Sequence, residues 1–255
     1  MDLPLNISKK NYLFLGSSHI GSILKAHNEA DSTQLKNGYQ FKFLMDFKID
    51  SRIIEPVDGD FVNFALISEL QAYLDSITNV DGLIISISGS DYLPICISNS
   101  NPPYDVILPS APELPIIDNA TVIPVAEIRS RLTRDIRHIL LGIQEIKRLT
   151  NLPLYYLQSP PPIGSNSHIE SHSAWAKNII EKNGISPASL RYKIWQIHSD
   201  LIEEKCNELR IPYFYNPSEL LEDGCYLHRN AYADDLMHAN TWYGKIFLTH
   251  IDGRI

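Results

Sequence analysis

Apolar and polar positions divide the chain into short continuous apolar runs and longer stretches with apolar residues at helical spacing. The clearest run lies within residues 81–88, where Leu83, Ile84, Ile85 and Ile87 form a nearly continuous apolar stretch that is rich in β-branched side chains. That pattern is typical of a strand buried on both faces of a parallel sheet. Shorter runs predict further strands at 11–15, 39–47, 152–157 and 211–215.

Between these runs the apolar residues recur at the period of an amphipathic helix. The predicted helices cover 19–30, 64–77, 125–149, 169–182, 187–209 and 240–250. Strands separated by helices indicate an α/β fold, in which helices cover both faces of a mostly parallel sheet. We therefore expect a three-layer α/β/α sandwich with about five strands.

One stretch, at about 93–124, follows neither pattern and contains seven prolines. Irregular segments of this length inside a compact domain are usually binding loops or lids. No internal repeat and no change of composition marks a linker. We therefore expect a single domain over residues 1–255 that carries this proline-rich insert.

Composition and charge narrow the class of protein. With 30 acidic and 22 basic residues the net charge is −8, and 44% of the residues are hydrophobic, as in a globular protein. No basic stripe is present to hold phosphate backbones, so we expect no nucleic-acid partner. No apolar run approaches the roughly 18 residues of a membrane-spanning helix, and the first residues do not resemble a secretory signal. We expect no membrane span and a cytoplasmic location.

The first predicted strand leads directly into the sequence Gly-Ser-Ser-His-Ile-Gly at 16–21. A phosphate loop needs Lys and then Ser or Thr after its second glycine, and a dinucleotide fingerprint needs glycine where Ser18 stands; neither motif is present. A serine at such a turn can be a nucleophile beside backbone N–H groups that hold an oxyanion. The alternative is that Ser17 or Ser18 only caps the following helix.

A second candidate turn lies near the end of the chain, where Asp235 and His238 are three residues apart. In one tight turn the carboxylate can reach the imidazole, and a nucleophilic serine needs a base that is oriented in this way. The alternative is that Asp235 caps the last helix and His238 is an ordinary surface residue.

Together the two turns resemble the first and last blocks of the SGNH (GDSL-type) hydrolase family, in a variant with Gly-x-Ser-His in the first block. Ser17 stands where this family usually has Asp or Asn. The last block, Asp-x-x-His followed by Asn and an aromatic-Gly pair, corresponds to 235–240 with Tyr243 and Gly244 behind it. The resemblance implies a flavodoxin-like α/β/α fold and an esterase or acyltransferase activity that needs no cofactor.

By this resemblance Ser18 is the nucleophile, His238 is the general base and acid, and Asp235 is the carboxylate that orients it. His19, directly after the nucleophile, is a candidate contact for the substrate. The α/β-hydrolases also have the order Ser, Asp, His, but their elbow is Gly-x-Ser-x-Gly, and Ile20 stands at the position of the second glycine.

The middle blocks match less well. The third block of the family is Gly-x-Asn-Asp, and here 88–91 read Ser-Gly-Ser-Asp, which places Ser90 at the oxyanion position and Asp91 after it. A hydroxyl can donate to an oxyanion but is less fixed than an amide, so a weaker oxyanion hole is expected. Gly59 is the candidate for the second-block N–H donor, with Gly38 as the alternative.

Other pairs with ligand spacing do not predict a metal site. His168 and His172 are one helical turn apart, but Glu170 between them is out of place for the His-Glu-x-x-His pattern. Cys225 and His228 have the spacing of half a zinc site without a second pair. One of the two histidines after the fourth strand could still contact substrate.

Three functions therefore stay open. The first is hydrolysis of an O-acyl, preferably acetyl, ester of a carbohydrate or small metabolite. The second is transfer of the same acyl group to a sugar hydroxyl. The third is carbohydrate binding with weak or no catalysis, since Ser17 and Ser90 both depart from the pattern of the family.

Overall fold

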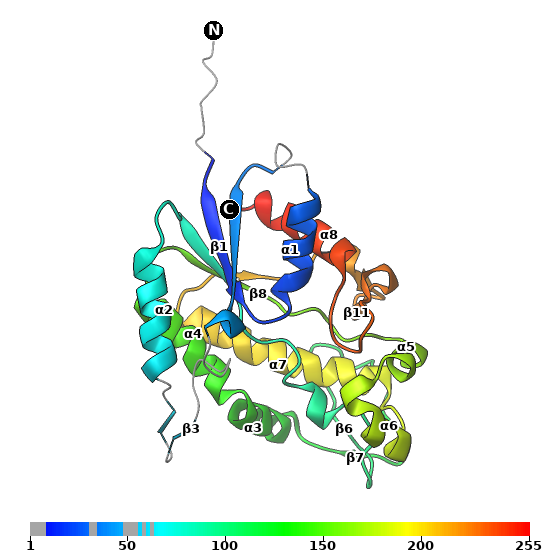
Figure 1. Cartoon of the computed structure of the whole chain (residues 1–255). Helices are drawn as coiled ribbons and strands as arrows, with labels where there is room; N and C mark the ends of the chain where they lie inside the picture. Colours follow the sequence, from blue (N-terminus) through cyan, green and yellow to red (C-terminus); the bar gives the residue numbers. More distant parts are fainter. Residues whose placement is uncertain (1–8, 31–34, 48–55, 58–59, 62–63) are drawn as a thin grey trace.

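The computed structural model describes residues 9–30, 35–47, 56–57, 60–61 and 64–255. A five-stranded sheet lies at its centre (Figure 1). Its strands are β1 (Asn11–Gly16), β2 (Gly38–Phe43), β5 (Gly82–Ser86), β8 (Leu154–Leu157) and β9 (Tyr213–Phe214). They lie in the order β2-β1-β5-β8-β9, and each strand is parallel to its neighbours. The predicted α/β fold with a parallel sheet of about five strands is confirmed.

The helices connect these strands in the way that parallel pairing requires. They are α1 (Ile20–Glu29), α2 (Phe64–Ser76), α3 (Val125–Asp135), α4 (Arg137–Leu149), α5 (Asn166–Ser171), α6 (Lys177–Asn183), α7 (Ala188–Glu208) and α8 (Thr241–Asp252). Short strands outside the central sheet are β3 (Pro56–Val57), β4 (Asp60–Phe61), β6 (Tyr104–Asp105), β7 (Thr121–Val122), β10 (Leu221–Glu222) and β11 (Tyr226–Leu227). Single 3-10 turns lie at Leu44–Asp46, Leu93–Ile95, Ala174–Ala176, Ser218–Leu220 and Arg229–Ala231.

The central strands β1 and β5 form the core. Leu83, Ile84 and Ile85 in β5 expose none of their surface, because helices cover both faces of the sheet. Burial of each such side chain stabilises the fold by about 1.5–3 kcal/mol. Helices α1 and α8 pack side by side, apart from the group of α2, α3, α4 and α7 (Figure 1). Gly244 allows the first of these contacts, since a Cβ there would lie 2.1 Å from the carbonyl oxygen of Ser22.

Two predicted helices are divided in the structure. The helix expected at 125–149 is broken at Ile136, whose φ of −101° and ψ of 12° leave the helical region. Because Ile136 is itself fully buried, the apolar pattern runs through the break and does not reveal it. The helix expected at 169–182 is two short helices, α5 and α6, with a 3-10 turn between them.

The proline-rich insert at 93–124 is packed on α7 through a buried ion pair. Lys193 Nζ lies 2.9 Å from Asp105 Oδ1, with side-chain exposures of 1% and 0%. The lysine also donates to the carbonyl of Pro115, and the carboxylate accepts the N–H groups of Val106 and Ile117. A buried pair is tolerated when its remaining hydrogen-bonding groups are satisfied in this way. The insert is thus fixed to the helix that borders the candidate site.

In the described part of the chain, no helix is long and apolar enough to cross a membrane.

Candidate active site

The turn after β1 places Ser18 at the carboxyl edge of the sheet. Gly16 ends the strand, and a Cβ there would lie 2.4 Å from the carbonyl oxygen of Ser86 in β5, so only glycine fits. Ser17 turns toward the sheet, with its N–H donating to the Ser86 carbonyl at 2.9 Å. Ser18 is exposed, and the N-cap of α1 is His19 without a side-chain cap. The alternative in which Ser17 or Ser18 caps this helix is therefore wrong.

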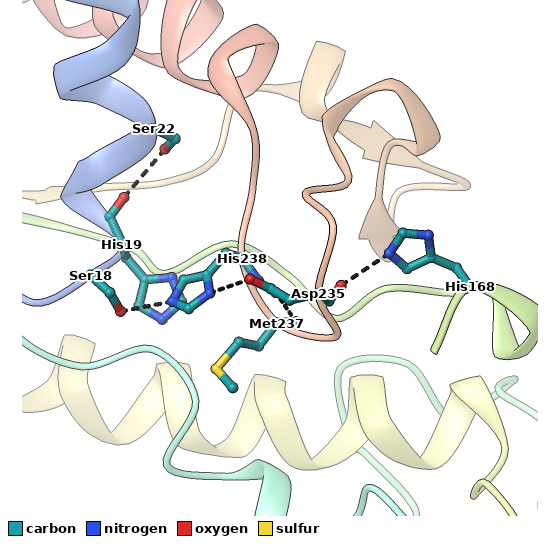
Figure 2. Close-up of polar contacts among 7 residues, drawn as sticks. All are labelled: Ser18, His19, Ser22, His168, Asp235, Met237 and His238. Atoms are coloured by element: carbon teal, nitrogen blue, oxygen red, sulfur yellow. Dashed lines mark hydrogen bonds and ion pairs between the residues drawn. The ribbon is translucent and has the colours of Figure 1, made fainter. Parts of the chain in front are cut away.

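Ser18, His238 and Asp235 form one continuous hydrogen-bonded line (Figure 2). Ser18 Oγ lies 2.7 Å from His238 Nε2, and His238 Nδ1 lies 2.7 Å from Asp235 Oδ2. The other carboxylate oxygen, Oδ1, accepts the N–H groups of Met237 at 2.8 Å and of His238 at 2.7 Å. The carboxylate thus fixes both the ring and the backbone of the turn. The structure brings together the three residues that the sequence predicted.

The last helix has its own cap, which leaves Asp235 for the histidine. Asn240 is the N-cap of α8, and its side-chain oxygen accepts the N–H groups of Trp242 and Tyr243. Its amide nitrogen donates to the carbonyls of Asn230 and Tyr232, which holds the turn against the preceding loop. The alternative in which Asp235 caps the helix is therefore wrong.

The environment of Asp235 favours its ionised form. Partial burial raises the pKa of Asp235, but the hydrogen bonds from the His238 ring and from the N–H groups of Met237 and His238 lower it by more. The pKa of Asp235 therefore lies well below its ordinary value. An ionised carboxylate holds the proton of the imidazole on Nδ1, so that Nε2 is free to accept the proton of Ser18.

His19 lies beside the line of three residues, with its ring centre 4.9 Å from that of His238 (Figure 2). It is only 7% exposed, so it packs against His238 inside the protein and offers little surface to a substrate. Burial, and then the nearby His238, lower the pKa of His19 to about 4. Its edge packs on Gly89, where a Cβ would lie 1.8 Å from His19 Nε2. Only glycine at 89 leaves room for this ring.

The turn at 88–91 follows β5, the strand beside β1, and so lies at the same edge of the sheet as Ser18. Asp91 Oδ2 accepts the hydroxyl of Ser88 at 3.0 Å and the N–H of Gly89 at 3.3 Å. Asp91, which follows Ser90 in the third block and was, like His19, a candidate contact for the substrate from the sequence, is therefore engaged inside the turn. Ser90, the predicted oxyanion donor, is half-buried, and its carbonyl accepts the N–H of Leu93.

The sequence did not indicate His198, which comes from α7. Its Nε2 lies 3.0 Å from Ser88 Oγ, and the residue exposes none of its surface. Burial lowers the pKa of His198 to about 4, although Asp91 acts in the opposite direction. His198 is 110 residues from Ser88 and lies within a helical pattern, so no local signal identified it.

Gly38 and Gly59 are the two candidates for the N–H donor of the second block. Gly38 begins β2 at the opposite edge of the sheet, and its N–H donates to the carbonyl of Lys10 at 2.7 Å. It cannot contribute to the site. Gly59 lies outside the described residues.

His168 contacts the Asp235 turn from the side away from Ser18 (Figure 2). Its Nε2 lies 3.0 Å from the carbonyl oxygen of Asp235, and its ring stacks on that of His172 at 4.2 Å. Beside it is a cavity of about 570 Å³. The cavity is lined by Gly164, Ser165, His168, Glu222, Asp223, Tyr226, Arg229 and Tyr232.

The histidines whose spacing suits metal ligands have other hydrogen-bond partners in the structure. His172 Nδ1 lies 2.9 Å from the carbonyl oxygen of His168, and His228 Nδ1 accepts the N–H of Asn230. Within the residues that the structure describes, no group of three or more His, Cys, Asp or Glu side chains could hold a metal ion.

No protein-family model and no curated protein sequence matches the chain. Among solved structures, a protein from Bacteroides fragilis assigned as an acylhydrolase is similar at 10% sequence identity and a TM-score of 0.50, covering 97% of this chain and 87% of that chain. A GDSL-like lipase from Bacteroides thetaiotaomicron is similar at 12% identity and a TM-score of 0.50, covering 96% and 86%. The chain therefore has the fold of SGNH (GDSL-type) hydrolases, which confirms the resemblance at the level of the fold.

Proposed function

We propose that the protein is a serine ester hydrolase of the SGNH type, with Ser18 as nucleophile. The observation that carries the proposal is the line from Ser18 Oγ through His238 to Asp235, with 2.7 Å at each step. A serine hydroxyl that is hydrogen-bonded to an oriented imidazole is the arrangement that activates a weak nucleophile. The two solved structures with this fold, an acylhydrolase and a lipase, agree with ester chemistry.

The reaction proceeds through an acyl-enzyme in two steps. Ser18 Oγ attacks the ester carbonyl while His238 Nε2 takes its proton, and the C–O bond to the alcohol breaks as the imidazolium returns that proton to the leaving oxygen. Water then attacks the acyl-Ser18 carbonyl, with His238 again as base, and releases the carboxylic acid and free Ser18. Asp235 stabilises the imidazolium in both steps without taking the proton itself.

The negative charge that develops on the carbonyl oxygen needs hydrogen-bond donors that are already in place. We assign this role to the N–H of Ser18, the hydroxyl of Ser90 and the N–H of Gly59. The support for the first two is their position at the ends of adjacent strands, β1 and β5, at one edge of the sheet. Gly59 follows from the family resemblance alone.

We propose that the ester is an O-acyl, preferably acetyl, group on a carbohydrate or related metabolite. Ser18 is exposed, so a small acyl group can reach it while the rest of a larger substrate lies along the surface. The cavity beside His168 lies across the Asp235 turn from Ser18 (Figure 2), where the part of a larger substrate that extends past this turn would reach it. It offers two tyrosine rings, Tyr226 and Tyr232, together with the charged groups of Glu222 and Asp223. Apolar faces combined with a few polar groups are suited to bind a hydroxylated ring.

The experiment that tests the activity is labelling with a fluorophosphonate probe. We expect the wild-type protein to be labelled at Ser18 and to hydrolyse p-nitrophenyl acetate. Ser18→Ala should abolish both, and the matched control Ser17→Ala should keep both, because Ser17 faces the sheet. Labelling that persists in Ser18→Ala would overturn the assignment of the nucleophile.

The same assay separates the related functions. If added sugars accept the acyl group in preference to water, the protein is an O-acyltransferase that uses the same three residues. If the probe does not react and no ester is hydrolysed, the result favours the third function, carbohydrate binding with weak or no catalysis. For the substrate class, Tyr226→Ala should raise KM for an acetylated sugar and leave p-nitrophenyl acetate unaffected, while Tyr215→Ala, an exposed tyrosine outside the cavity, should change neither.

A further inference from the structure

The turn that carries Ser90 is held from both sides by buried histidines. His198 from α7 bonds Ser88 at the start of the turn, and His19 from the nucleophile turn packs on Gly89. We propose that His198 is a positioning residue that acts through Ser88 and Asp91 to fix Ser90 for oxyanion binding. This inference rests on the proposed hydrolase function.

The direction of the hydrogen bonds follows from the number of protons. The hydroxyl of Ser88 has one proton, which it donates to Asp91 Oδ2 at 3.0 Å. The 3.0 Å contact with His198 must therefore be donated by the ring, so His198 carries its proton on Nε2. The result is a chain in which His198 donates to Ser88, Ser88 donates to Asp91, and Asp91 also accepts the N–H of Gly89.

The other nitrogen of His198 agrees with this assignment. Nδ1 is buried and has no hydrogen-bond partner among the described residues. A proton on Nδ1 would leave a buried N–H group unpaired, which is more unfavourable than an unpaired acceptor of a neutral ring. His198 is thus a neutral ring with one fixed donor, and it takes no part in proton transfer with Ser18.

His19 limits the turn from the opposite side. Its ring occupies the space that a Cβ of residue 89 would fill, so Gly89 cannot move toward His238 without displacing His19. The Ser90 carbonyl is also engaged, because it accepts the N–H of Leu93 at 3.0 Å. The backbone on each side of Ser90 is therefore fixed, and only the hydroxyl rotor is free.

This arrangement matters because a hydroxyl is a less fixed donor than an amide. A donor contributes to catalysis when it is already placed where charge develops, so any loss of order in the turn reduces its contribution. The hydrogen bonds that connect His198 through Ser88 to Asp91 restrict the backbone that carries the Ser90 hydroxyl. They also connect the turn to α7, the helix that anchors the proline-rich insert through Lys193.

The test compares two substitutions at His198 that differ in one donor. His198→Gln keeps an amide N–H at a similar reach, whereas His198→Leu removes it. With p-nitrophenyl acetate as substrate, we expect His198→Leu to lower kcat about fivefold to tenfold and to leave KM little changed. A loss of this size corresponds to roughly one hydrogen bond. His198→Gln should restore most of the rate. Ser88→Ala, which breaks the chain from the other end, should reproduce His198→Leu.

The matched control is Ser199→Ala on the same helix. Ser199 is equally buried and bonds Gln158 and Tyr213, so its loss destabilises α7 without touching the 88–91 turn. We expect it to lower the melting temperature as much as His198→Leu and to leave kcat unchanged. Equal losses of kcat in the two variants would overturn the inference.

A double-mutant cycle tests whether His198 acts through Ser90. In the Ser90→Ala background His198→Leu should have no further effect on kcat, because the donor that it positions is absent. Additive losses in the double variant would overturn the inference.

A second measurement does not depend on activity. Amide hydrogen exchange at Gly89, whose N–H donates to Asp91, and at Leu93, whose N–H donates to the Ser90 carbonyl, should be slow in the wild type. It should be faster in His198→Leu and Ser88→Ala and unchanged in Ser199→Ala. Unchanged exchange would overturn the positioning role even if the protein proves to have no esterase activity. Absence of labelling at Ser18 in the wild type would instead overturn the proposed function. The exchange measurement would still decide whether His198 orders the 88–91 turn.

Discussion

Two turns in this molecule combine an aspartate, a histidine and a serine but have different roles. At 235–238 a carboxylate accepts two backbone N–H groups and one imidazole N–H. At 88–91 a carboxylate accepts one backbone N–H and the hydroxyl of Ser88, which in turn bonds an imidazole. The side chain of His238 is 27% exposed and reaches Ser18, whereas His198 is fully buried. Exposure and the direction of the hydrogen bond therefore distinguish the candidate base from the buried histidine: His238 can accept the proton of Ser18, whereas His198 donates to Ser88.

The difference extends to how each turn is held. The Asp235 carboxylate bonds groups within three positions, and the Asn240 cap lies behind the turn. His168 adds a long-range hydrogen bond to the Asp235 carbonyl. The 88–91 turn has internal hydrogen bonds from Ser88 and Gly89 to Asp91. It is also packed by His19, the N-cap of α1, and bonded by His198 of α7, both far away in the chain. The first should keep its shape when distant parts of the fold are altered, and the second should not.

The largest expected effect is the loss of Ser18 or His238. Ser18→Ala and His238→Ala should each lower kcat by on the order of 10⁴-fold or more, and the double variant should be no worse, because nucleophile and base act as one unit. Hydrolysis of p-nitrophenyl acetate measures the loss, with circular dichroism to confirm folding. Additive losses would show that the two residues do not act together.

Asp235→Asn should have the next largest effect, on the order of 10³-fold, since the amide can favour the wrong tautomer of His238 while the base stays in place. The neighbouring exposed Asp234 provides the control. Asp234→Asn should be silent. If Asp234→Asn is damaging and Asp235→Asn silent, the residue that orients His238 has been misidentified.

The contrast between the turns also explains how far the sequence could predict this site. Local spacing made Ser18 a candidate at a strand end and placed Asp235 within one turn of His238. Their assignment to one site came from the family resemblance, because Ser18 and His238 are 220 residues apart. His198 was not predictable, because its partner Ser88 is 110 residues away and a buried histidine in a helix has no distinctive pattern. The break at Ile136 escaped detection for a related reason, since its side chain continues the apolar stripe of the helices around it.

The two buried histidines predict a pH dependence of stability. Burial lowers the pKa of His19 and of His198 to about 4, and both titrate near 6.5 in the unfolded chain. Between pH 6.5 and 4 the unfolded state binds protons that the folded state does not, so the free energy of unfolding falls as the pH falls. The expected loss is about 3 kcal/mol for each ring.

Urea unfolding at pH 7 and at pH 4.5 measures this loss. Asp235 does not interfere, because its lowered pKa contributes stability that is lost only below the ordinary pKa of Asp, at still lower pH. His198→Gln should flatten the pH dependence by about half. A dependence equal to that of the wild type would mean that His198 is charged in the folded protein.

Among the residues assigned to the chemistry, Ser90 should show the smallest effect, and it gives the sharpest test of the 88–91 turn. Ser90→Ala removes one donor among several, and we expect kcat to fall by roughly 10²-fold, as for the loss of one oxyanion donor. Ser90→Asn restores the amide that the SGNH pattern has at this position and should match or exceed the wild type, because an amide donor is more fixed than a hydroxyl. Ser90→Thr, which keeps the hydroxyl, is the matched control for size. If alanine and asparagine give the same rate, position 90 supplies no oxyanion donor, and the turn that His198 and His19 hold serves only to pack the site.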